Sequence, residues 1–499
     1  MMNNSMKAVG ALALVAACVL ATASVWGADA RHEALARQII ADTGVKGGLV
    51  VHVGCGDGKL TAALRQNDGY LVHGLDADPA NVERAREHIR SLGLYGKVSA
   101  EQWDSEYLPY TDNLVNLLVL DGAADVRMRE VRRVLAPEGA AYVEIGDQWM
   151  TNTNPRPGEI DEWTHFLHDA TNNAVAHDAL VGPPKHLQWI GSPKWARSHD
   201  HLASVSAVVS ANGRIFYIAD EGPTATVALP TAWFLVGRDA FSGVTLWRRA
   251  VRPWEGHLRG FRSGPSEIPR RLVAVDETVY VTLGYGKPVT ALDAATGTTL
   301  RTYKGTAGAD EILYHEGVLY LTAGDAAAQL ADAAKRRGIT LPPPSKDVLA
   351  VKADTGALLW RKSDDDTRGL MPLTLAVADG RVFFQNTKAV VCLDARSGER
   401  IWRTERRANL KRPAWSAPTL VVYEDVVLSA ERGESTRVGG ETLGSGDVGW
   451  LVSSSGGDAP VGDLIAFSAE TGRELWRCEA REAYNAPPDV LVAGGLVWT

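Results

Sequence analysis

The sequence predicts a multidomain protein in which an N-terminal α/β, Rossmann-like domain precedes an all-β propeller. Two patterns predict this division: a strand, a glycine-rich loop and a helix open an alternating β/α series, and a turn motif recurs five times after residue 203. The length agrees, because 499 residues exceed the size of about 250–300 residues at which single cores stop growing. We therefore expect domains at residues 33–147 and 203–499, joined by a linker over residues 148–202.

The first 30 residues have the order of a secretory signal peptide. Lys7 gives a basic start, residues 8–25 are apolar, and Ala28-Asp29-Ala30 supplies a small-x-small site, which predicts cleavage after Ala30 and export to the periplasm. In one alternative, residues 15–18 resemble a bacterial lipoprotein box that would leave a lipidated Cys18. In another, the apolar stretch of about 18 residues is an uncleaved membrane anchor, near the lower length limit for spanning.

The net charge and the cysteine content of the sequence indicate which partners and which stabilising links to expect. The net charge of -8 supplies no basic field for a phosphate backbone, so nucleic acid is excluded as an expected partner. Beyond the signal the cysteines are Cys55, Cys392 and Cys478, an odd and widely spaced set that forms neither a disulfide framework nor a zinc pattern. We expect the folded domains to be stabilised by their apolar cores.

A glycine loop follows the first predicted strand. Residues 47–53 are apolar, Gly54, Gly56 and Gly58 come next, and residues 59–65 have a helical pattern. Glycines permit a tight turn and a close approach of the backbone to a ligand, so this order predicts a nucleotide cradle.

The remainder of the first domain continues the β/α alternation. A strand over residues 70–75 ends in Asp76, whose carboxylate is placed to accept hydrogen bonds from both hydroxyls of a ribose. Further elements are predicted as a helix over residues 79–92, strands over 98–102 and 114–120, a helix over 126–135 and a strand over 140–145. Such alternation predicts a parallel sheet with helices on both faces.

These residues resemble a class I S-adenosylmethionine (SAM)-dependent methyltransferase of the small-molecule, type 11 kind. The matching stretches are V-x-V-G-C-G-D-G (51–58), G-L-D-A-D (74–78), W-D-S-E-Y-L-P-Y (103–110) and R-R-V-L-A-P-E-G (132–139). The resemblance implies that Gly54, Gly56 and Gly58 line the methionine part of SAM, that Asp76 holds the ribose, and that Asp104 meets the adenine amino group.

Three departures from that family leave an alternative open. His52 stands where the family usually has an acid, and Val115-Asn116 stands where the fourth strand usually opens with Phe-Asp. After the fifth strand the chain turns into a Pro/Asn-rich linker over residues 151–158, without the family's further helix and antiparallel pair. A cleft open on that side binds a nucleotide without transferring a methyl group, or is a relic that has lost its ligand.

Histidine is concentrated in the junction between the domains. Six of the twelve histidines lie within residues 161–201. If this segment is helical, His165 and His168 share a face and, with Asp169 or His177, could ligate a divalent metal or haem iron. The alternative is a hydrogen-bonded junction in which Trp163 and Trp189 pack against the propeller and the polar groups cap loops.

The propeller is predicted from repeated hairpins. Five segments share an Asp or Ala, a Ser or Thr, a glycine, and a Leu or Ile three residues later, and four of them add a tryptophan; the glycines are Gly243, Gly297, Gly356, Gly398 and Gly472. The polar side chains bond the turn backbone, and the glycine takes the positive φ that closes the turn. The tryptophan on the emerging strand is placed to wedge into the next blade.

Other turns complete the blades. We predict inner hairpins with turns at residues 212–213, 276–277, 316–317, 379–380 and 424–425, and insertions at residues 326–337 and 433–462 that project from one rim. Residues 493–499 fall within the second strand of a sixth blade, so we expect an incomplete ring and a longer parent protein.

The repeats resemble the tryptophan-docked blades of PQQ-dependent dehydrogenases and of the outer-membrane assembly lipoprotein that shares the fold without a cofactor. No two cysteines are adjacent here, although such a pair often stacks on the quinone in the dehydrogenases. Three functions follow: a SAM-dependent methyltransferase with the propeller as recognition platform, an exported scaffold with a relic nucleotide fold, and a PQQ-dependent oxidoreductase. The expected partner is a small molecule or protein on the propeller rim, with membrane contact only through the N-terminal signal.

Overall fold

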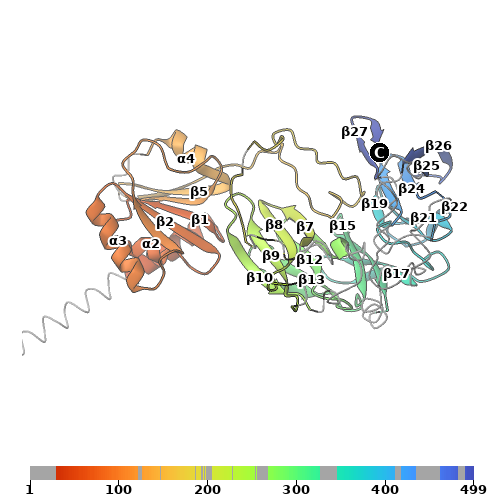
Figure 1. Cartoon of the computed structure of the whole chain (residues 1–499), viewed down its shortest axis with the longest axis horizontal. Helices are drawn as coiled ribbons and strands as arrows, with labels where there is room; N and C mark the ends of the chain where they lie inside the picture. The colour runs from red at the N-terminus through yellow and green to blue at the C-terminus, as the bar shows by residue number, and fades with distance from the viewer. Residues whose placement is uncertain are drawn as a thin grey trace, which may run out of the picture. The chain divides into compact units, whose positions relative to one another are not determined.

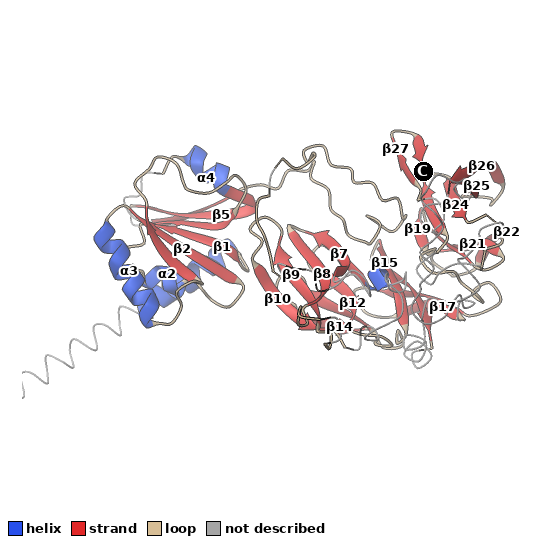
Figure 2. Cartoon of the chain, viewed as in Figure 1, coloured by secondary structure: helices blue, strands red, loops and turns tan. Residues whose placement is uncertain are grey.

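The computed structural model describes residues 30–121, 126–146, 148–185, 187–192, 195, 197, 205–226, 229–252, 254, 268–325, 345–410, 417–433, 461–481 and 489–499. The chain divides into two compact units. The first comprises Met1–Pro157, Pro184–Ile190 and Asp239–Leu246, and the second comprises Gly158–Pro183, Gly191–Arg238 and Trp247–Thr499. Described helices gather around the sheet of the first unit, while the second unit is built mainly of strands (Figures 1 and 2).

The first unit contains a sheet with the strand order β3-β2-β1-β4-β5-β6. A helix over residues 30–43 precedes it. The elements are β1 (Gly48–Val53), α2 (Lys59–Ala63), β2 (Tyr70–Asp76), α3 (Pro79–Ser91), β3 (Val98–Gln102), β4 (Val115–Leu120), α4 (Met128–Val134), β5 (Leu135–Ile145) and β6 (Gln148–Thr153). Strands β1 to β5 run parallel, which confirms the predicted α/β class.

Local sequence explains these elements. All residues of β1 are buried, as a central strand covered on both faces requires. Pro79 opens α3, and Asp78 caps it by accepting a hydrogen bond from the Ala80 backbone at 2.9 Å. Its buried residues, Val82, Ala85 and Ile89, pack on one face of the sheet.

The end of the sheet differs from the prediction. Strand β5 begins at Leu135, with Glu138 at a φ of 65°, and β6 then pairs antiparallel with it from Ile145↔Gln148 to Ala140↔Thr153. This strand lies in the segment assigned to the linker. The sequence did not predict this strand because β6, QWMTNT, is almost entirely exposed and has no alternation of apolar and polar residues.

The second unit contains five four-stranded antiparallel sheets and a two-stranded sheet among the described residues, the arrangement of propeller blades. The first three sheets are β7 (Val205–Ala211), β8 (Arg214–Asp220), β9 (Trp233–Asp239) and β10 (Thr245–Ala250); β11 (Leu272–Val275), β12 (Thr278–Thr282), β13 (Val289–Asp293) and β14 (Thr299–Thr302); and β15 (Ala309–His315), β16 (Val318–Gly324), β17 (Lys346–Lys352) and β18 (Leu358–Lys362). The others are β19 (Ala376–Ala378), β20 (Arg381–Gln385), β21 (Ala389–Asp394) and β22 (Arg400–Glu405); β23 (Thr419–Tyr423), β24 (Val426–Glu431), β25 (Val461–Ser468) and β26 (Glu474–Arg481); and β27 (Leu491–Ala493) with β28 (Leu496–Trp498). A short 3₁₀ helix, η1 (Ile268–Arg271), precedes β11.

The predicted turn chemistry is confirmed. Asp394 Oδ1 accepts hydrogen bonds from the backbone and the hydroxyl of Ser397, both at 2.8 Å, and Gly398 has a φ of 75°. Each predicted inner hairpin also turns through a residue with positive φ, namely Asn212, Asp276, Glu316, Asp379 and Glu424. The sequence-predicted turns therefore fall at the blade hairpins of the structure.

Tryptophan docking joins neighbouring blades. The indole Nε1 of Trp360 donates to the Ala395 carbonyl at 2.8 Å, and Trp402 bonds Ala469 at 2.9 Å in the same way. A Cβ on Gly398 would lie 2.7 Å from Trp360, so the glycine also provides the surface on which the ring packs. In the blade that lacks the tryptophan, Tyr303 takes its place and donates to the Ala353 carbonyl at 2.6 Å.

Several predictions fall outside the described residues. These are the signal peptide with Cys18, the insertion over residues 326–337, most of the insertion over residues 433–462, and His186, His199 and His201. No helix of the described part is long and apolar enough to cross a membrane.

Candidate functional site

Every predicted SAM-binding residue lies at or just beyond the carboxyl end of a strand in the parallel sheet. Residues 54–58, here called the glycine loop, follow β1, Asp76 ends β2, and Asp104 comes two residues after β3. The strand order reverses direction between β1 and β4, which are adjacent although β2 and β3 separate them in sequence. Ligands of open α/β sheets bind outside the carboxyl ends of the strands at such a switch point.

The three loop glycines have different roles. All have positive φ, but a Cβ on Gly54 would lie 2.6 Å from the Asp121 carbonyl oxygen, and one on Gly58 would lie 2.7 Å from the Ala85 Cα. A Cβ on Gly56 would have no described atom within 4 Å. Gly54 and Gly58 therefore hold the loop against the sheet and α3, whereas Gly56 faces the open side of the loop.

Asp76 fastens the glycine loop to the sheet. Its Oδ2 accepts a hydrogen bond from the Gly56 backbone at 2.9 Å, and its Oδ1 accepts from the Asp78 backbone and the Asn81 amide, both at 3.0 Å. The side chain is buried, with 8% of the residue exposed. The structure thus shows Asp76 positioning the loop, a role that the sequence prediction had not included.

Asp104 lies at the same edge of the sheet but makes no hydrogen bond or ion pair with the described residues. It is exposed and follows Trp103, whose backbone bonds the Asp76 carbonyl at 2.9 Å and whose indole bonds the Tyr107 carbonyl at 2.8 Å. The carboxylate of Asp104 is therefore available to solvent next to a backbone fixed by its neighbour.

A polar pair at the switch point was missed by the sequence analysis. His52, buried within β1, bonds the Thr61 hydroxyl of α2 at 2.8 Å through Nδ1, and its Nε2 lies 3.8 Å from Oδ2 of Asp121. The polar interaction with the His52 ring lowers the pKa of Asp121 despite partial burial. Asp121 directly follows the apolar run of β4, and that position could have identified it.

Cys55 does not offer a reactive thiol. Burial, together with the nearby charge of Asp76, raises the pKa of Cys55 to about 12. A thiol is nucleophilic only as the thiolate, so the loop supplies backbone groups and shape, and no nucleophile.

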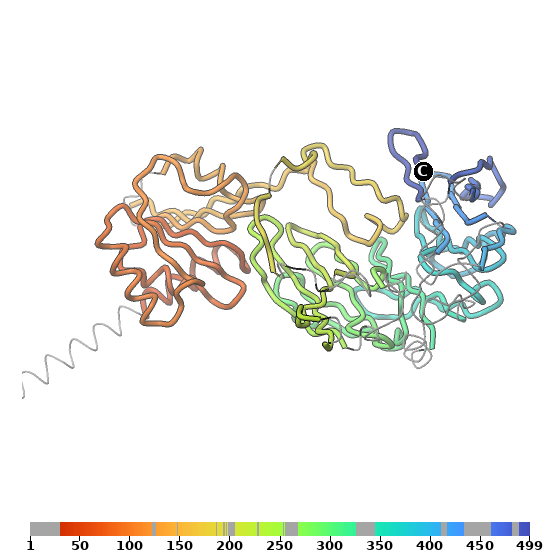
Figure 3. The backbone as a smooth tube through the Cα atoms, viewed as in Figure 1, coloured from red at the N-terminus to blue at the C-terminus, as the bar shows by residue number. Residues whose placement is uncertain are grey.

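The histidine-rich junction forms a different kind of structure, which we call the collar (residues 161–173). It contacts the first strand of each sheet of the second unit in turn. Backbone N–H groups of Ser210, Ala274, Tyr314, Val377, Val422 and Val492 donate respectively to Trp163 O, Thr164 O, His165 Nε2, Ala170 O, Thr171 O and Asn173 Oδ1, at 2.7–3.0 Å. Figure 3 shows this segment as the yellow stretch of tube reaching the blue C-terminal strands.

The six donors occupy equivalent positions in their blades. Each lies two residues before a turn residue of positive φ, from Asn212 in the first sheet to Gly494 in the last. The innermost strand of a blade leaves backbone donors unpaired along its free edge, and these need acceptors. The collar supplies one acceptor to each blade.

The metal hypothesis does not fit this geometry. No part of residues 161–173 is helical, so His165 and His168 do not share a helix face; an isolated antiparallel bridge joins them instead. Both ring nitrogens of His165 are engaged, by Thr164 Oγ1 at 2.7 Å and the Tyr314 backbone at 2.9 Å. Burial lowers the pKa of His165 to about 3, so its ring is neutral. Within the described ranges no three His, Cys, Asp or Glu side chains are grouped to hold a metal.

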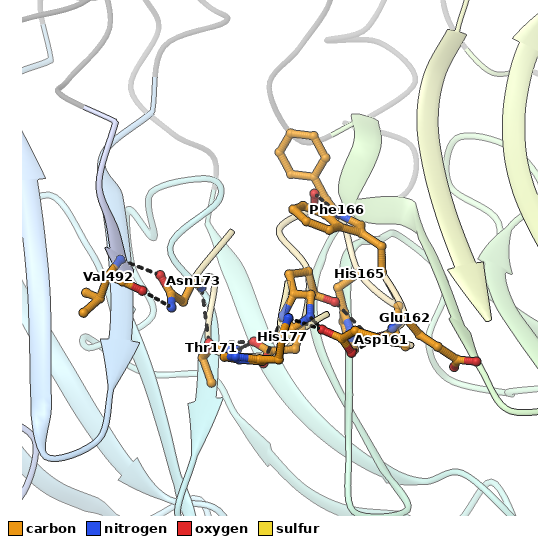
Figure 4. A network of polar contacts seen from close by, with 12 residues as sticks. Asp161, Glu162, His165, Phe166, Thr171, Asn173, His177 and Val492 are labelled. Carbon is orange, nitrogen blue, oxygen red and sulfur yellow. Dashed lines mark hydrogen bonds and ion pairs between the residues drawn. The ribbon is translucent and has the colours of Figure 1, made fainter. Parts of the chain in front are cut away.

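His168 clasps the collar. Its Nε2 lies 2.7 Å from Asp161 Oδ2 and its Nδ1 lies 3.4 Å from Asp169 Oδ2. Its ring makes T-shaped contacts with the rings of Trp163 and His177. Asp161 also accepts a hydrogen bond from the His177 backbone at 2.6 Å (Figure 4). The predicted alternative, a hydrogen-bonded junction, matches these contacts, with Trp163 bonding the Phe166 carbonyl at 3.1 Å and Trp189 the Ala240 carbonyl at 2.9 Å.

Two family models match the chain. Residues 50–139 match a model described as a methyltransferase domain, and residues 344–438 match one described as outer membrane protein assembly factor BamB. Together with the strand topology, these matches confirm both resemblances predicted from the sequence.

Curated relatives match the same two regions. Methyltransferase GfsG of Streptomyces halstedii is 36% identical over 99 residues, 19% of this chain and 36% of that protein. The ubiquinone/menaquinone biosynthesis C-methyltransferase UbiE of Pseudoalteromonas translucida is 32% identical over 122 residues, 22% of this chain and 48% of that protein. Polyvinylalcohol dehydrogenase of a Sphingopyxis species is 27% identical over 168 residues, 30% of this chain and 22% of that protein. The chain thus spans less than half the length of each of these relatives.

Among solved structures, BamB from Moraxella catarrhalis covers 59% of this chain and 66% of its own, with 14% identity and a TM-score of 0.35.

Proposed function

We propose that the first unit binds SAM at the β1/β4 switch point and that the chain is a SAM-dependent methyltransferase-like protein whose propeller serves as a recognition platform. The observation that carries this proposal is the glycine loop, which Asp76 fixes in place while Gly56 faces open space. A relative described as a methyltransferase and the family model over residues 50–139 support the same chemistry.

The residues present fit a nucleoside ligand. The open side at Gly56 allows a ligand to approach the backbone closely, as glycine loops permit. The Asp76 carboxylate stands beside the loop, where ribose hydroxyls would meet it, and the Asp104 carboxylate is solvent-accessible at the same edge for an adenine amino group. When bound, SAM supplies an activated methyl group.

The role of the protein is then to position the two reactants. The Asp76 bond to Gly56 keeps the loop in one conformation, which reduces the ordering cost of binding. The His52 and Asp121 pair places a carboxylate with a lowered pKa, ionised at neutral pH, at the switch point. Such a group attracts the sulfonium charge of SAM and repels an anionic acceptor.

Binding of SAM and of S-adenosylhomocysteine, measured by isothermal titration calorimetry, tests the proposal. We expect saturable binding by the full chain and at least a tenfold loss for Asp76→Asn, because a buried charge-assisted hydrogen bond is worth about 1.5–3 kcal/mol. Glu83→Gln on the exposed side of α3 is the matched control and should bind as the wild type does.

Absence of heat with the wild type, or equal affinity of both variants, would reject the methyltransferase proposal. Either result would favour the second candidate, an exported scaffold with a relic nucleotide fold, which the collar and the match to the BamB family model support.

Export itself is part of the proposal. Sequencing the mature N-terminus from fractionated cells distinguishes cleavage after Ala30 from lipidation at Cys18 or an uncleaved anchor.

The quinoprotein hypothesis has weaker support. It depends on one dehydrogenase relative, which matches 30% of this chain and of which 22% is covered. We therefore assign no step to PQQ. Dye reduction by the full chain with added PQQ and calcium would restore this hypothesis.

A further inference from the structure

Asp121 belongs to a row of groups along one edge of the sheet in the first unit. Strands β1 to β5 are parallel, so their carboxyl ends meet at the same edge. In the strand order β3-β2-β1-β4, Asp104 follows β3, Asp76 ends β2, the glycine loop follows β1, and Asp121 follows β4. Three strand spacings, about 14 Å, separate the first position from the last. A ligand that lies along this edge therefore meets Asp121 at the end opposite Asp104.

Asp121 also lies against the start of the glycine loop. Its backbone N–H donates to the Val53 carbonyl at 3.0 Å, and a Cβ on Gly54 would lie 2.6 Å from its carbonyl oxygen. Its side chain is 40% exposed. The carboxylate of Asp121 is thus reachable from solvent, directly beside the loop to which the resemblance assigns the methionine part of SAM.

His52 presents an unsatisfied ring nitrogen to this carboxylate. The residue is buried, with 1% exposed, and its Nδ1 is engaged by the Thr61 hydroxyl at 2.8 Å. Its Nε2 lies 3.8 Å from Oδ2 of Asp121 and has no hydrogen-bond partner among the described residues. A buried polar atom without a partner requires an explanation. A shift of the Asp121 side chain by about 1 Å would bring the two groups within hydrogen-bond distance.

The carboxylate of Asp121 suits one of the two positive groups of SAM better than the other. The polar interaction with the His52 ring, with smaller contributions from Glu144 and His32, lowers the pKa of Asp121 despite partial burial. Carboxylates form their strongest hydrogen bonds with charged N–H donors. The sulfonium of SAM has no N–H group, whereas the ammonium at the end of the methionine tail has three. The ammonium is therefore the group that this carboxylate can bind through hydrogen bonds.

We propose that Asp121, positioned by His52, binds the ammonium group of the methionine tail of SAM. The ligand then lies along the edge with its adenine at Asp104, its ribose at Asp76 and its tail against Asp121. The Thr61 hydroxyl donates to Nδ1 of His52, so Nε2 carries the ring proton toward Asp121. His52 acts through Asp121 and not on the ligand. This inference rests on the proposed SAM binding and adds the residue that selects a cationic tail.

Two ligands separate this role from SAM binding in general: S-adenosylhomocysteine and its deaminated analogue, in which hydrogen replaces the ammonium group. Calorimetric titration of the wild-type full chain should show at least tenfold tighter binding of S-adenosylhomocysteine. In Asp121→Asn this preference should fall below threefold, while the affinity for the analogue stays the same or rises because a negative charge is removed. Asp68→Asn makes the same change at a side chain that is 98% exposed before β2, and this control should keep the full preference.

His52→Leu tests the positioning role. It should reduce the preference for S-adenosylhomocysteine at least threefold and leave the affinity for the analogue unchanged, whereas a purely structural loss would weaken both ligands equally. If His52→Leu does not fold by circular dichroism, Thr61→Val keeps the size of the side chain and removes the hydroxyl that orients the ring. That variant should reduce the preference at least twofold. An unchanged preference in the folded variant would overturn the role of His52.

The remaining outcomes distinguish this inference from the proposed function. A wild type that binds neither ligand would reject SAM binding and this inference with it. Equal affinity of the wild type for both ligands, or an equal loss of both in Asp121→Asn, would overturn the role of Asp121 and leave SAM binding in place. A loss in Asp121→Asn for SAM but not for S-adenosylhomocysteine, which has no sulfonium, would assign Asp121 to the sulfonium and also overturn the inference.

Discussion

The glycine loop and the collar are both irregular segments organised by aspartates, yet they treat their polar groups in opposite ways. In the glycine loop, Asp76 fixes the backbone and Gly56 is left facing open space. In the collar, the backbone acceptors and the Asn173 side chain are bonded to the inner strands of the blades. We therefore expect the loop to receive a ligand and the collar to stabilise the blades.

The largest loss of stability is expected from a substitution in the glycine loop. Gly58→Ala should destabilise the protein by about 3 kcal/mol, because its Cβ meets the Ala85 Cα at 2.7 Å and its φ is 79°. Gly56→Ala, with the same type of φ and open space, should cost about 1 kcal/mol. Urea unfolding followed by far-UV circular dichroism measures both, and equal losses would contradict the division of roles.

A collar variant should have a slightly smaller effect on stability. Asn172 donates to the Leu375 carbonyl at 3.0 Å and the Leu420 carbonyl at 2.9 Å, at a φ of 67° that asparagine tolerates. Asn172→Ala leaves two buried carbonyls unpaired and should cost about 2–3 kcal/mol in denaturant unfolding. The exposed Asn152→Ala on β6 is the control, and a loss no larger than its own would show that the collar does not stabilise the blades.

The docking of tryptophans between blades should contribute less to the free energy of unfolding than the Asn172 hydrogen bonds do. Trp402→Phe keeps an aromatic ring on Gly472 and removes the hydrogen bond to the Ala469 carbonyl, so we expect a loss of about 1–2 kcal/mol. Trp476→Phe, at a tryptophan that is 40% exposed, should change the midpoint of thermal unfolding by less than Trp402→Phe does. The reverse order would contradict the docking role.

The His168 clasp should give the smallest effect, visible as a pH dependence. Interaction with the Asp169 and Asp161 carboxylates raises the pKa of His168 and outweighs burial. The stabilisation by His168 is therefore complete below the unfolded pKa of about 6.5 and is lost as pH rises through the folded value. Burial opposes the lowered pKa values of Asp161 and Asp169, which are set by hydrogen bonds from the His177 backbone and from His168. These two contribute above about pH 4, so the clasp is strongest between about pH 4 and 6.5.

Thermal unfolding of wild type and His168→Gln at pH 6 and pH 9 measures this dependence. The difference between the two proteins should shrink by a few degrees at pH 9. A difference that is constant across this range would show that His168 contributes no charge.

The sequence predicted regular features well because each has a local cause. The glycine loop, the cap and proline of α3, and the hairpin turns at Asp394 to Gly398 depend on residues close in sequence. It missed β6, whose exposed residues carry no apolar pattern, and the pairing of His52 with Asp121, which the sheet brings together from positions 69 residues apart.

The collar could not be predicted from local pattern either. Its partners extend from Ser210 to Val492, and nothing near His165 in the sequence specifies the Tyr314 backbone as its partner. Histidines close in sequence suggested a metal, although the inner strands of the blades required acceptors. Long-range backbone pairing of this kind is visible only when all the blades are in place.

We propose that the glycine loop is open to SAM and that the collar stabilises the propeller. Titration of S-adenosylhomocysteine into Gly56→Val and Asn173→Ala, each with its unfolding midpoint, tests both halves at once. We expect Gly56→Val to lose binding and keep most of its stability, and Asn173→Ala, which loses both bonds to Val492, to bind normally and unfold at a lower temperature. Unchanged binding by Gly56→Val would contradict it.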